Sequence, residues 1–137
     1  MIEQAFYSYI INVAAITDLV ALRIFPDSAP QSVVLPCIIY EKTGADRQLN
    51  LLKSSGVVTA TLQLDIFAKT RLSVENIVEQ IRLAFDGYQG NWDTTTIFIA
   101  KLDNESVGFD LETATEVGTF RATIDLVVTF LETVTTF

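Results

Sequence analysis

The chain has 137 residues, half of them hydrophobic, and its nine basic and seventeen acidic residues give a net charge of −8. This length allows one well-packed core and is short for two ordinary domains, so we expect a single domain over residues 1–137. Histidine is absent, which excludes catalytic triads and paired-histidine zinc motifs, and the acidic excess disfavours tight binding of nucleic acid phosphates.

The first predicted element is a helix over residues 2–13. Apolar side chains recur there at the spacing of one helical face, and neither Gly nor Pro interrupts the segment. A short turn is expected over residues 18–22, followed by an irregular connector over residues 25–30 that contains two prolines. The N-terminus lacks the basic start of a signal peptide and no apolar run is long enough to span a bilayer, which favours a cytosolic protein.

A first strand is predicted over residues 37–42, with Pro36 at its entry because proline cannot donate a hydrogen bond inside a sheet. Cys37 lies in this apolar run, and we interpret it as a core residue and not as a nucleophile. Residues 43–56 are mostly polar and predict a long, flexible hairpin loop. The leucines in this loop either lengthen the flanking strands or form a surface that contacts a partner protein, and the sequence leaves both interpretations open.

The strongest pattern lies between residues 58 and 87. Every second residue from 58 to 68 is apolar, which predicts a half-buried strand, and helical spacing follows over residues 74–88. We expect Ser73 to cap the N-terminus of this helix and Leu72 to pack on Ile77. Gly87 is expected to end the helix, because glycine accepts the left-handed geometry of helix C-termini.

Two further strands are predicted in the C-terminal part. Residues 94–102 are apolar on both sides, residues 103–106 resemble a turn, and residues 119–130 alternate regularly. The element order is then helix, strand, strand, helix, strand, strand. It predicts an α+β two-layer sandwich of about four mainly antiparallel strands with both helices on one face, and it leaves the exact strand order open.

Paired carboxylates are the one candidate for chemistry. Asp65 and Asp125 lie on predicted strands, and two carboxylates are able to hold a metal or to share acid–base work. The simpler interpretation, which we favour, is that both are solvated or that Arg121 pairs with one of them. The acidic residues in 103–110 lack the spacing of a calcium loop, and no glycine-rich phosphate motif occurs. We expect no catalytic residue, no metal site and no cofactor.

Several strings along the chain, taken together, are similar to one known family. They are RIFP at 23–26, APQ at 29–31, LPCIIY at 35–40, LDIFAKT at 64–70, FDG at 85–87 and a closing strand that starts near FR at 120–121. In this order the chain resembles, over nearly its whole length, the tail-completion or tail-terminator proteins of long-tailed bacteriophages and prophages. None of the strings is a catalytic signature.

The resemblance implies a non-enzymatic protein that forms a ring, of six copies in the better-known relatives, on the last ring of the tail tube. Such a ring stops tube growth and helps to join the tail to the head. The implied partners are further copies of the chain, the tail-tube protein and a head-completion or connector protein. DNA passes through the ring without sequence-specific binding, and no membrane is involved. The implied places are the host cytoplasm during assembly and then the virion tail.

The residues alone suit a second function equally well, a small acidic inhibitor or ligand-binding α+β module that binds one partner protein. If the protein forms a ring on the tail tube, the 43–56 segment is the predicted interface. Its leucine cluster is expected to contact a neighbouring subunit or the tube, and its basic residues are expected to contact acidic groups there. The predicted interface residues are Asp46, Arg47, Gln48, Leu49, Leu51, Leu52 and Lys53. A secondary interface is predicted at the threonine-rich end, at Thr133, Thr135 and Phe137.

Overall fold

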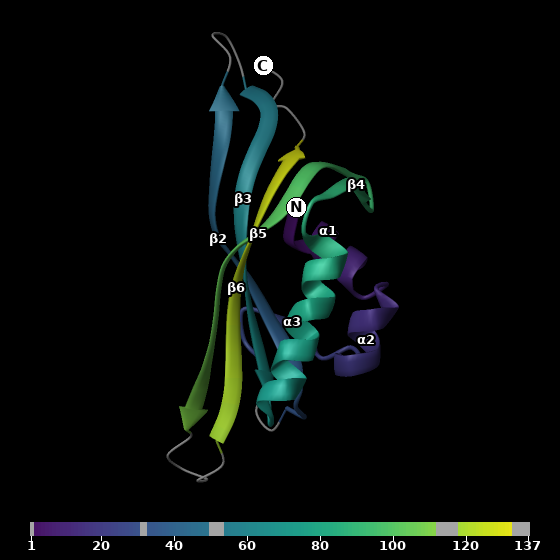
Figure 1. Cartoon of the computed structure of the whole chain (residues 1–137). Helices are drawn as coiled ribbons and strands as arrows, with labels where there is room; N and C mark the ends of the chain where they lie inside the picture. The colour runs from purple at the N-terminus through teal and green to yellow at the C-terminus, as the bar shows by residue number, and fades with distance from the viewer. Residues whose placement is uncertain (1, 31–32, 50–53, 112–117, 133–137) are drawn as a thin grey trace.

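A computed structural model describes residues 2–30, 33–49, 54–111 and 118–132 of the chain. Within these residues it contains three helices and six strands (Figure 1). In chain order they are α1 (Ile2–Ile10), α2 (Ala14–Val20), β1 (Ile24–Pro26), β2 (Cys37–Leu49), β3 (Ser54–Ala68), α3 (Arg71–Phe85), β4 (Tyr88–Trp92), β5 (Thr95–Leu111) and β6 (Gly118–Leu131).

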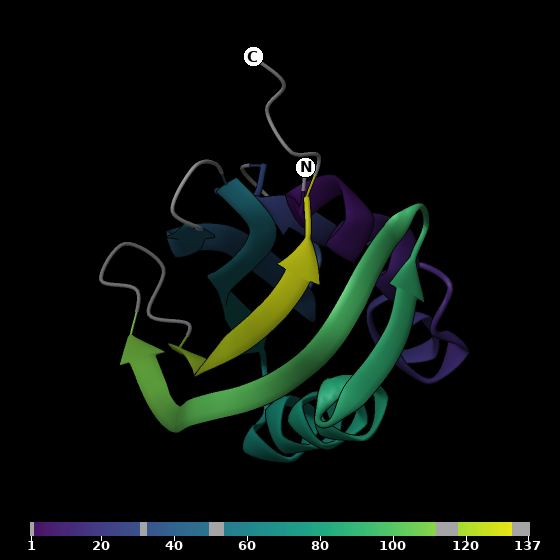
Figure 2. The same ribbon diagram turned by 90° about the horizontal axis from the view of Figure 1, so that it is seen from above.

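The strands form one mixed sheet in the order β1-β2-β3-β6-β5-β4. β1 pairs with β2 in parallel, and every other neighbouring pair is antiparallel. The sheet is strongly twisted, so that the β2–β3 hairpin and the β5–β6 hairpin lie at opposite ends of the molecule (Figure 1). Seen from above, the long strands curl around one side of the helices (Figure 2).

The core lies between one face of this sheet and the helices. Alternate residues of β3 and β6 are buried there, as the period of two predicted, and α3 turns its apolar stripe toward them. All three helices lie on this face, which confirms that the first and last predicted helices share one side of the sheet (Figure 1). The buried stripe of α3 consists of Val74, Ile77, Val78, Ile81 and Phe85.

Aromatic side chains join α1 to α3 and β4. The ring of Phe6 lies 5.4 Å from that of Phe85 and 6.0 Å from that of Trp92, between ring centroids. Tyr9 stacks on Trp92 at 5.7 Å, and its hydroxyl donates a hydrogen bond to the carbonyl oxygen of Ala84 at 3.2 Å. These contacts fix the helix layer against the sheet.

The described structure has more elements than the four strands and two helices that the sequence predicts. The sequence pattern does not indicate β1 and β4, which have three and five residues, and α2 was predicted only as a short turn at residues 18–22. A three-residue strand such as Ile24–Pro26 is too short to show an alternation, and it becomes a strand only because β2 pairs with it. The fold class α+β is confirmed, and the simple antiparallel sandwich is replaced by a six-stranded mixed sheet.

The start of α3 also differs from the prediction. The helix begins at Arg71, and the Thr70 side chain caps it by accepting a hydrogen bond from the Ser73 amide at 3.1 Å. Ser73 is therefore the donor of the cap and not the cap itself, and Leu72 is 69% exposed inside the helix. The end of the helix is as expected, with Gly87 at φ +80° just after Asp86.

Most of the segment predicted as a long loop is strand. β2 continues to Leu49 and β3 starts at Ser54, while residues 50–53 lie outside the described residues. The predicted turn at 103–106 likewise lies inside β5. Register shifts between Lys42 and Gly44 and between Asp103 and Glu105 explain both errors, because a bulge inserts a residue and breaks the alternation that identifies a strand.

Residues 94–102 are apolar on both sides, but only one side of this segment is buried, because the strand contains a third bulge. The register shifts between Ile97 and Ile99, so that Ile97 and Ala100 both face the core. Phe98 and Ile99 are instead 43% and 44% exposed.

Candidate assembly interface

Four of the predicted interface residues lie in the described structure, at one end of the sheet, on the part of β2 that passes beyond β1. Asp46 and Arg47 are exposed there on β2. Gln48 and Leu49 belong to the same strand, and their side chains lie outside the described structure. Leu51, Leu52 and Lys53 fall outside the described residues, as do the secondary candidates Thr133, Thr135 and Phe137.

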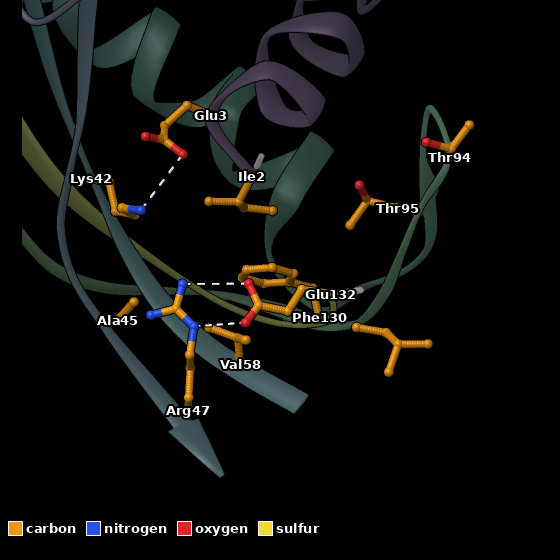
Figure 3. A pocket seen from close by; sticks show the side chains of 11 residues that line it. Ile2, Glu3, Lys42, Ala45, Arg47, Val58, Thr94, Thr95, Phe130 and Glu132 are labelled. Carbon is orange, nitrogen blue, oxygen red and sulfur yellow. Dashed lines mark hydrogen bonds and ion pairs between the residues drawn. The ribbon is translucent and has the colours of Figure 1, made fainter. Parts of the chain in front are cut away.

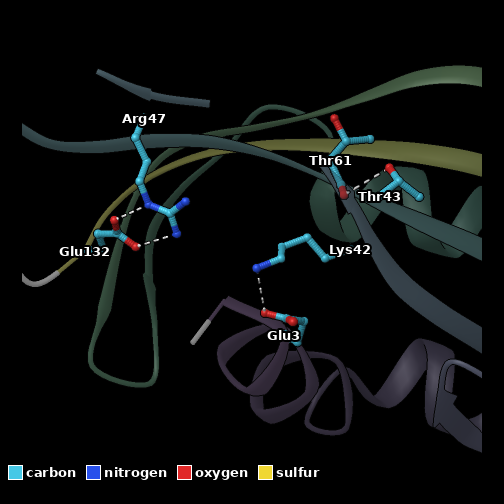
Figure 4. A network of polar contacts seen from close by, with 6 residues as sticks. All are labelled: Glu3, Lys42, Thr43, Arg47, Thr61 and Glu132. Atoms are coloured by element: carbon cyan, nitrogen blue, oxygen red, sulfur yellow. Dashed lines mark hydrogen bonds and ion pairs between the residues drawn. The ribbon is translucent and has the colours of Figure 1, made fainter. Parts of the chain in front are cut away.

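Arg47 already has an acidic partner within its own chain (Figure 4). Its Nε donates to Glu132 Oε1 at 2.6 Å and its Nη2 to Glu132 Oε2 at 3.4 Å. These hydrogen bonds and the carboxylate charge raise the pKa of the guanidinium further above its usual value. The Arg47 side chain remains 52% exposed, so its other N–H groups face solvent.

Next to this pair the helix-side face of the sheet forms a pocket of 390 Å³ (Figure 3). Its floor is apolar and consists of Ile2, Ala45, Val58 and Phe130, most of whose surface is buried, while mainly polar residues stand around the rim. The rim is made by Glu3, Lys42, Arg47, Thr94, Thr95, Leu131 and Glu132. Of these residues only Arg47 was predicted as a site residue, because the pocket is assembled from α1, β2, β3, β6 and the β4–β5 turn, which are far apart in the sequence.

A second ion pair closes the side of the pocket near α1. Lys42 Nζ lies 3.9 Å from Glu3 Oε1, too long for a hydrogen bond (Figure 4). Glu3 Oε1 is buried and has no hydrogen-bond partner in the described part of the chain. The two acidic and two basic side chains of the rim therefore balance in charge, and one carboxylate oxygen is left without a donor.

The opposite face of the sheet is polar. Asp65 accepts a hydrogen bond from Thr123 at 2.9 Å and pairs with Arg121 at 3.2 Å, which confirms the simpler interpretation of this carboxylate. Asp125 accepts from the Asn104 side chain at 3.3 Å and stands opposite Asp103 on β5. Among the described residues no cluster of three or more His, Cys, Asp or Glu side chains is placed to hold a metal ion.

This outer face is also acidic. Among the residues whose side chains the structure describes, the strand registers place five acidic and two basic ones on this face, and threonines fill much of the space between them. The charged residues of the outer face are Glu41, Asp46, Asp65, Asp103, Asp125, Lys101 and Arg121. Five acidic against two basic residues give this face a net charge of −3.

Cys37 is 1% exposed in the core, as predicted. Burial raises the pKa of its thiol, so that the reactive thiolate is disfavoured at neutral pH. In the part of the chain that the structure describes, no helix is long and apolar enough to cross a membrane.

Comparison with known proteins identifies the family. The model of the family described as Tail completion protein gp17 matches residues 4–128. The chain belongs to this tail completion family. Its role is accordingly structural and non-enzymatic, as a component of a phage-type virion tail.

A solved structure of similar fold comes from the virion of a native gene transfer agent particle. The TM-score is 0.64 at 7% sequence identity, and the alignment covers 93% of this chain and 92% of the other. At this identity the likeness establishes the fold alone. No curated protein matches the chain.

Proposed function

We propose that this tail completion protein caps the head-proximal end of a phage tail tube as a ring and helps to join the tail to the head. Membership of the tail completion family over residues 4–128 is the observation that carries the proposal. The proposed partners are further copies of the chain, six in the ring, together with the tail-tube protein and a head-completion or connector protein. The proposed site of assembly is the host cytoplasm.

The two faces of the sheet support this function. One face is covered by the helices and supplies the core, which makes each subunit rigid. The other carries, among the side chains that the structure describes, five acidic residues against two basic ones. An acidic, threonine-rich wall repels DNA phosphates and lets DNA pass without adhering, which is what the bore of a tail requires.

The two hairpins at opposite ends of the sheet also support it (Figure 1). A subunit that sits between a tube, a head connector and its own neighbours needs surfaces that extend beyond its core. The β2–β3 hairpin, with Asp46 and Arg47 exposed, is the surface that we assign to a neighbouring subunit or the tube.

The test is to make phage particles without this protein and then to restore it. We expect tails that are overlong or not joined to heads, and we expect purified protein to bind one end of isolated tail tubes and restore joining. The measurements are tail length and head attachment in electron micrographs. Tails of normal length that join heads in the absence of the protein would show that it has another role.

A further inference from the structure

The end of the sheet opposite the pocket carries an exposed stripe on β5. Glu105, Val107 and Phe109 stand opposite Ile124, Ala122 and Phe120 of β6, so they share the helix-side face of the sheet. Phe109 is 56% exposed and its ring lies 5.0 Å from that of Phe120. The stripe thus presents a carboxylate, an aliphatic side chain and a phenyl ring beyond the main core. We call it the β5 stripe.

The β2–β3 hairpin contributes a concave surface, the pocket described above. Lys42, Ala45 and Arg47 stand opposite Leu62, Ala60 and Val58 of β3, and they line the pocket with its apolar floor. A pocket of 390 Å³ lies at the small end of the size range of ligand-binding pockets. The β5 stripe has an exposed ring and a carboxylate. The pocket has an apolar floor and a rim of zero net charge, in which Arg47 is half-exposed beside Glu132.

The distribution of charge along the chain favours contact between these two ends. Residues 103–119 contain five acidic and no basic residues, whereas residues 42–56 contain three basic and one acidic residue. Copies of a chain with a net charge of −8 repel one another unless unlike charges meet locally. Among the side chains that the structure describes, these segments carry −2 (Asp103 and Glu105) and +1 (Lys42, Asp46 and Arg47), so contact between the two hairpins brings unlike charges together, whereas contact between like hairpins does not.

Both hairpins also have a free strand edge in the described structure. β1 pairs only with residues 38–40 of β2, and β4 pairs with β5 no further than Ala100. Each free edge is interrupted by a bulge, between Lys42 and Gly44 and between Asp103 and Glu105. Bulges discourage the addition of a continuous strand, so the contact is expected to rest on side chains.

We propose that the β5 stripe of one copy docks in the pocket of a second copy, head to tail. Phe109 packs on the floor formed by Val58 and Phe130, and Glu105 meets the free N–H groups of Arg47. The contact is heterologous, because it joins two different surfaces, and repetition of such a contact generates a closed ring when the rotation permits. The proposal rests on the proposed ring and names the residues that would hold it together.

Charge reversal with rescue tests the pairing. We expect Arg47→Glu and Glu105→Lys each to lower the yield of joined particles by about tenfold or more, and the double variant to recover most of it. Arg82→Glu is the matched control, since Arg82 is exposed and also pairs within its chain, with Glu79. Equal melting temperatures of the single variants and the parent show that they fold. Folded single variants that make normal particles, or a double variant without rescue, would overturn the pairing.

Cross-linking tests the geometry independently. Thr94 is exposed at the rim of the pocket, and Val107 is partly exposed in the β5 stripe, on the helix-side face of the sheet. Thr94 precedes β5 and Val107 lies toward its other end, about 13 residues of strand and thus on the order of 40 Å away, too far for a short cross-linker within one chain. In capped tails, Thr94→Cys with Val107→Cys should give a ladder of multimers with a short thiol cross-linker. Each single cysteine should give none.

The two results separate the docking from the proposed function. If cysteine variants that cap and join tails normally give no ladder, the docking is wrong and the capping function stands. A single cysteine that gives dimers would indicate contact between like surfaces, which also overturns the docking. If particles made without the protein have normal tails joined to heads, the proposed capping ring is refuted, whatever the cross-linking shows.

Discussion

Arg47 and Glu132 connect two strands that do not pair with each other. Arg47 belongs to β2 and Glu132 follows β6, and β3 runs between these strands. The ion pair therefore passes over β3, close to Val58, which is opposite Arg47 in the sheet. In this way the end of the last strand is tied to the β2–β3 hairpin, and the rim of the pocket keeps its shape.

Substitution of Ile81 by aspartate should unfold the protein. Ile81 is fully buried in the stripe that α3 presents to the sheet, and an unpaired buried charge costs several kcal/mol against a typical total stability of about 5 to 15 kcal/mol. Leu83→Asp is the matched control on the same helix, because Leu83 is 62% exposed, and it should change stability by less than about 0.5 kcal/mol. Thermal melts followed by circular dichroism decide the matter; an Ile81→Asp variant that melts like the parent would contradict this core.

Replacement of Leu49, Leu51 and Leu52 by serine should leave the thermal melt almost unchanged and impair assembly. Buried anchors at an interface commonly cost more than about 1 kcal/mol each when truncated, so the triple variant should release unjoined or overlong tails. The matched control replaces three leucines exposed elsewhere, Leu19, Leu22 and Leu83. Normal virions from the interface variant would show that these leucines are not part of an assembly interface.

The two carboxylates of the outer face should respond differently to neutralisation. Asp65→Asn removes the acceptor of Arg121 and Thr123 and should destabilise the protein by about 1 kcal/mol, discounted for the exposure of the arginine. Asp125→Asn should be neutral or slightly stabilising, because Asp125 stands opposite Asp103 and like charges at that distance repel. Denaturant titrations of the two variants measure the difference, and a larger loss for Asp125→Asn would contradict it.

Cys37 should make the protein less stable at alkaline pH. Burial raises the pKa of the thiol above its unfolded value, so the unfolded chain loses this proton at a lower pH than the folded chain does. The contribution of the neutral thiol is complete below the unfolded pKa and declines from roughly pH 8.5 upward. Cys37→Ala should lose less stability between neutral pH and pH 9.5 than the parent does. Parallel losses in the two proteins would rule out this linkage.

Regular elements with an uninterrupted period were predictable from the sequence. β3 and β6 alternate without a break over their buried parts, and α3 has a clear apolar stripe, so their type and their buried faces were found. The family was also predicted correctly, from several strings taken together in their order along the chain. The elements that were predicted wrongly are short or interrupted. β1 and β4 have too few residues to show a period, and bulges near Gly44 and Asn104 break the alternation, so that these strand segments were predicted as loop or turn.

The candidate site was less predictable, for a different reason. Arg47 was found because it lies in a polar stretch with several leucines, but the pocket beside it needs Ile2, Thr94 and Phe130, which come together only when the sheet has formed. The partner of Arg47 is 85 residues away in sequence, and no local pattern identifies it. The β5 stripe was missed because the bulge after Asp103 moves Glu105 to the helix side of the sheet.

The aromatic cluster around Trp92 gives the protein a built-in optical signal. Trp92 is the single tryptophan of the chain, it is fully buried, and it touches rings from α1, α3 and β4. Its fluorescence therefore reports whether the helices remain seated on the sheet, and a shift of its emission to longer wavelength marks their release into water. Thr95 at the rim of the pocket stands opposite Trp92 in the β4–β5 pair, so the indole lies beside a surface assigned to assembly. The emission spectrum of the free subunit therefore separates a variant that fails to fold from one that folds and fails only to assemble.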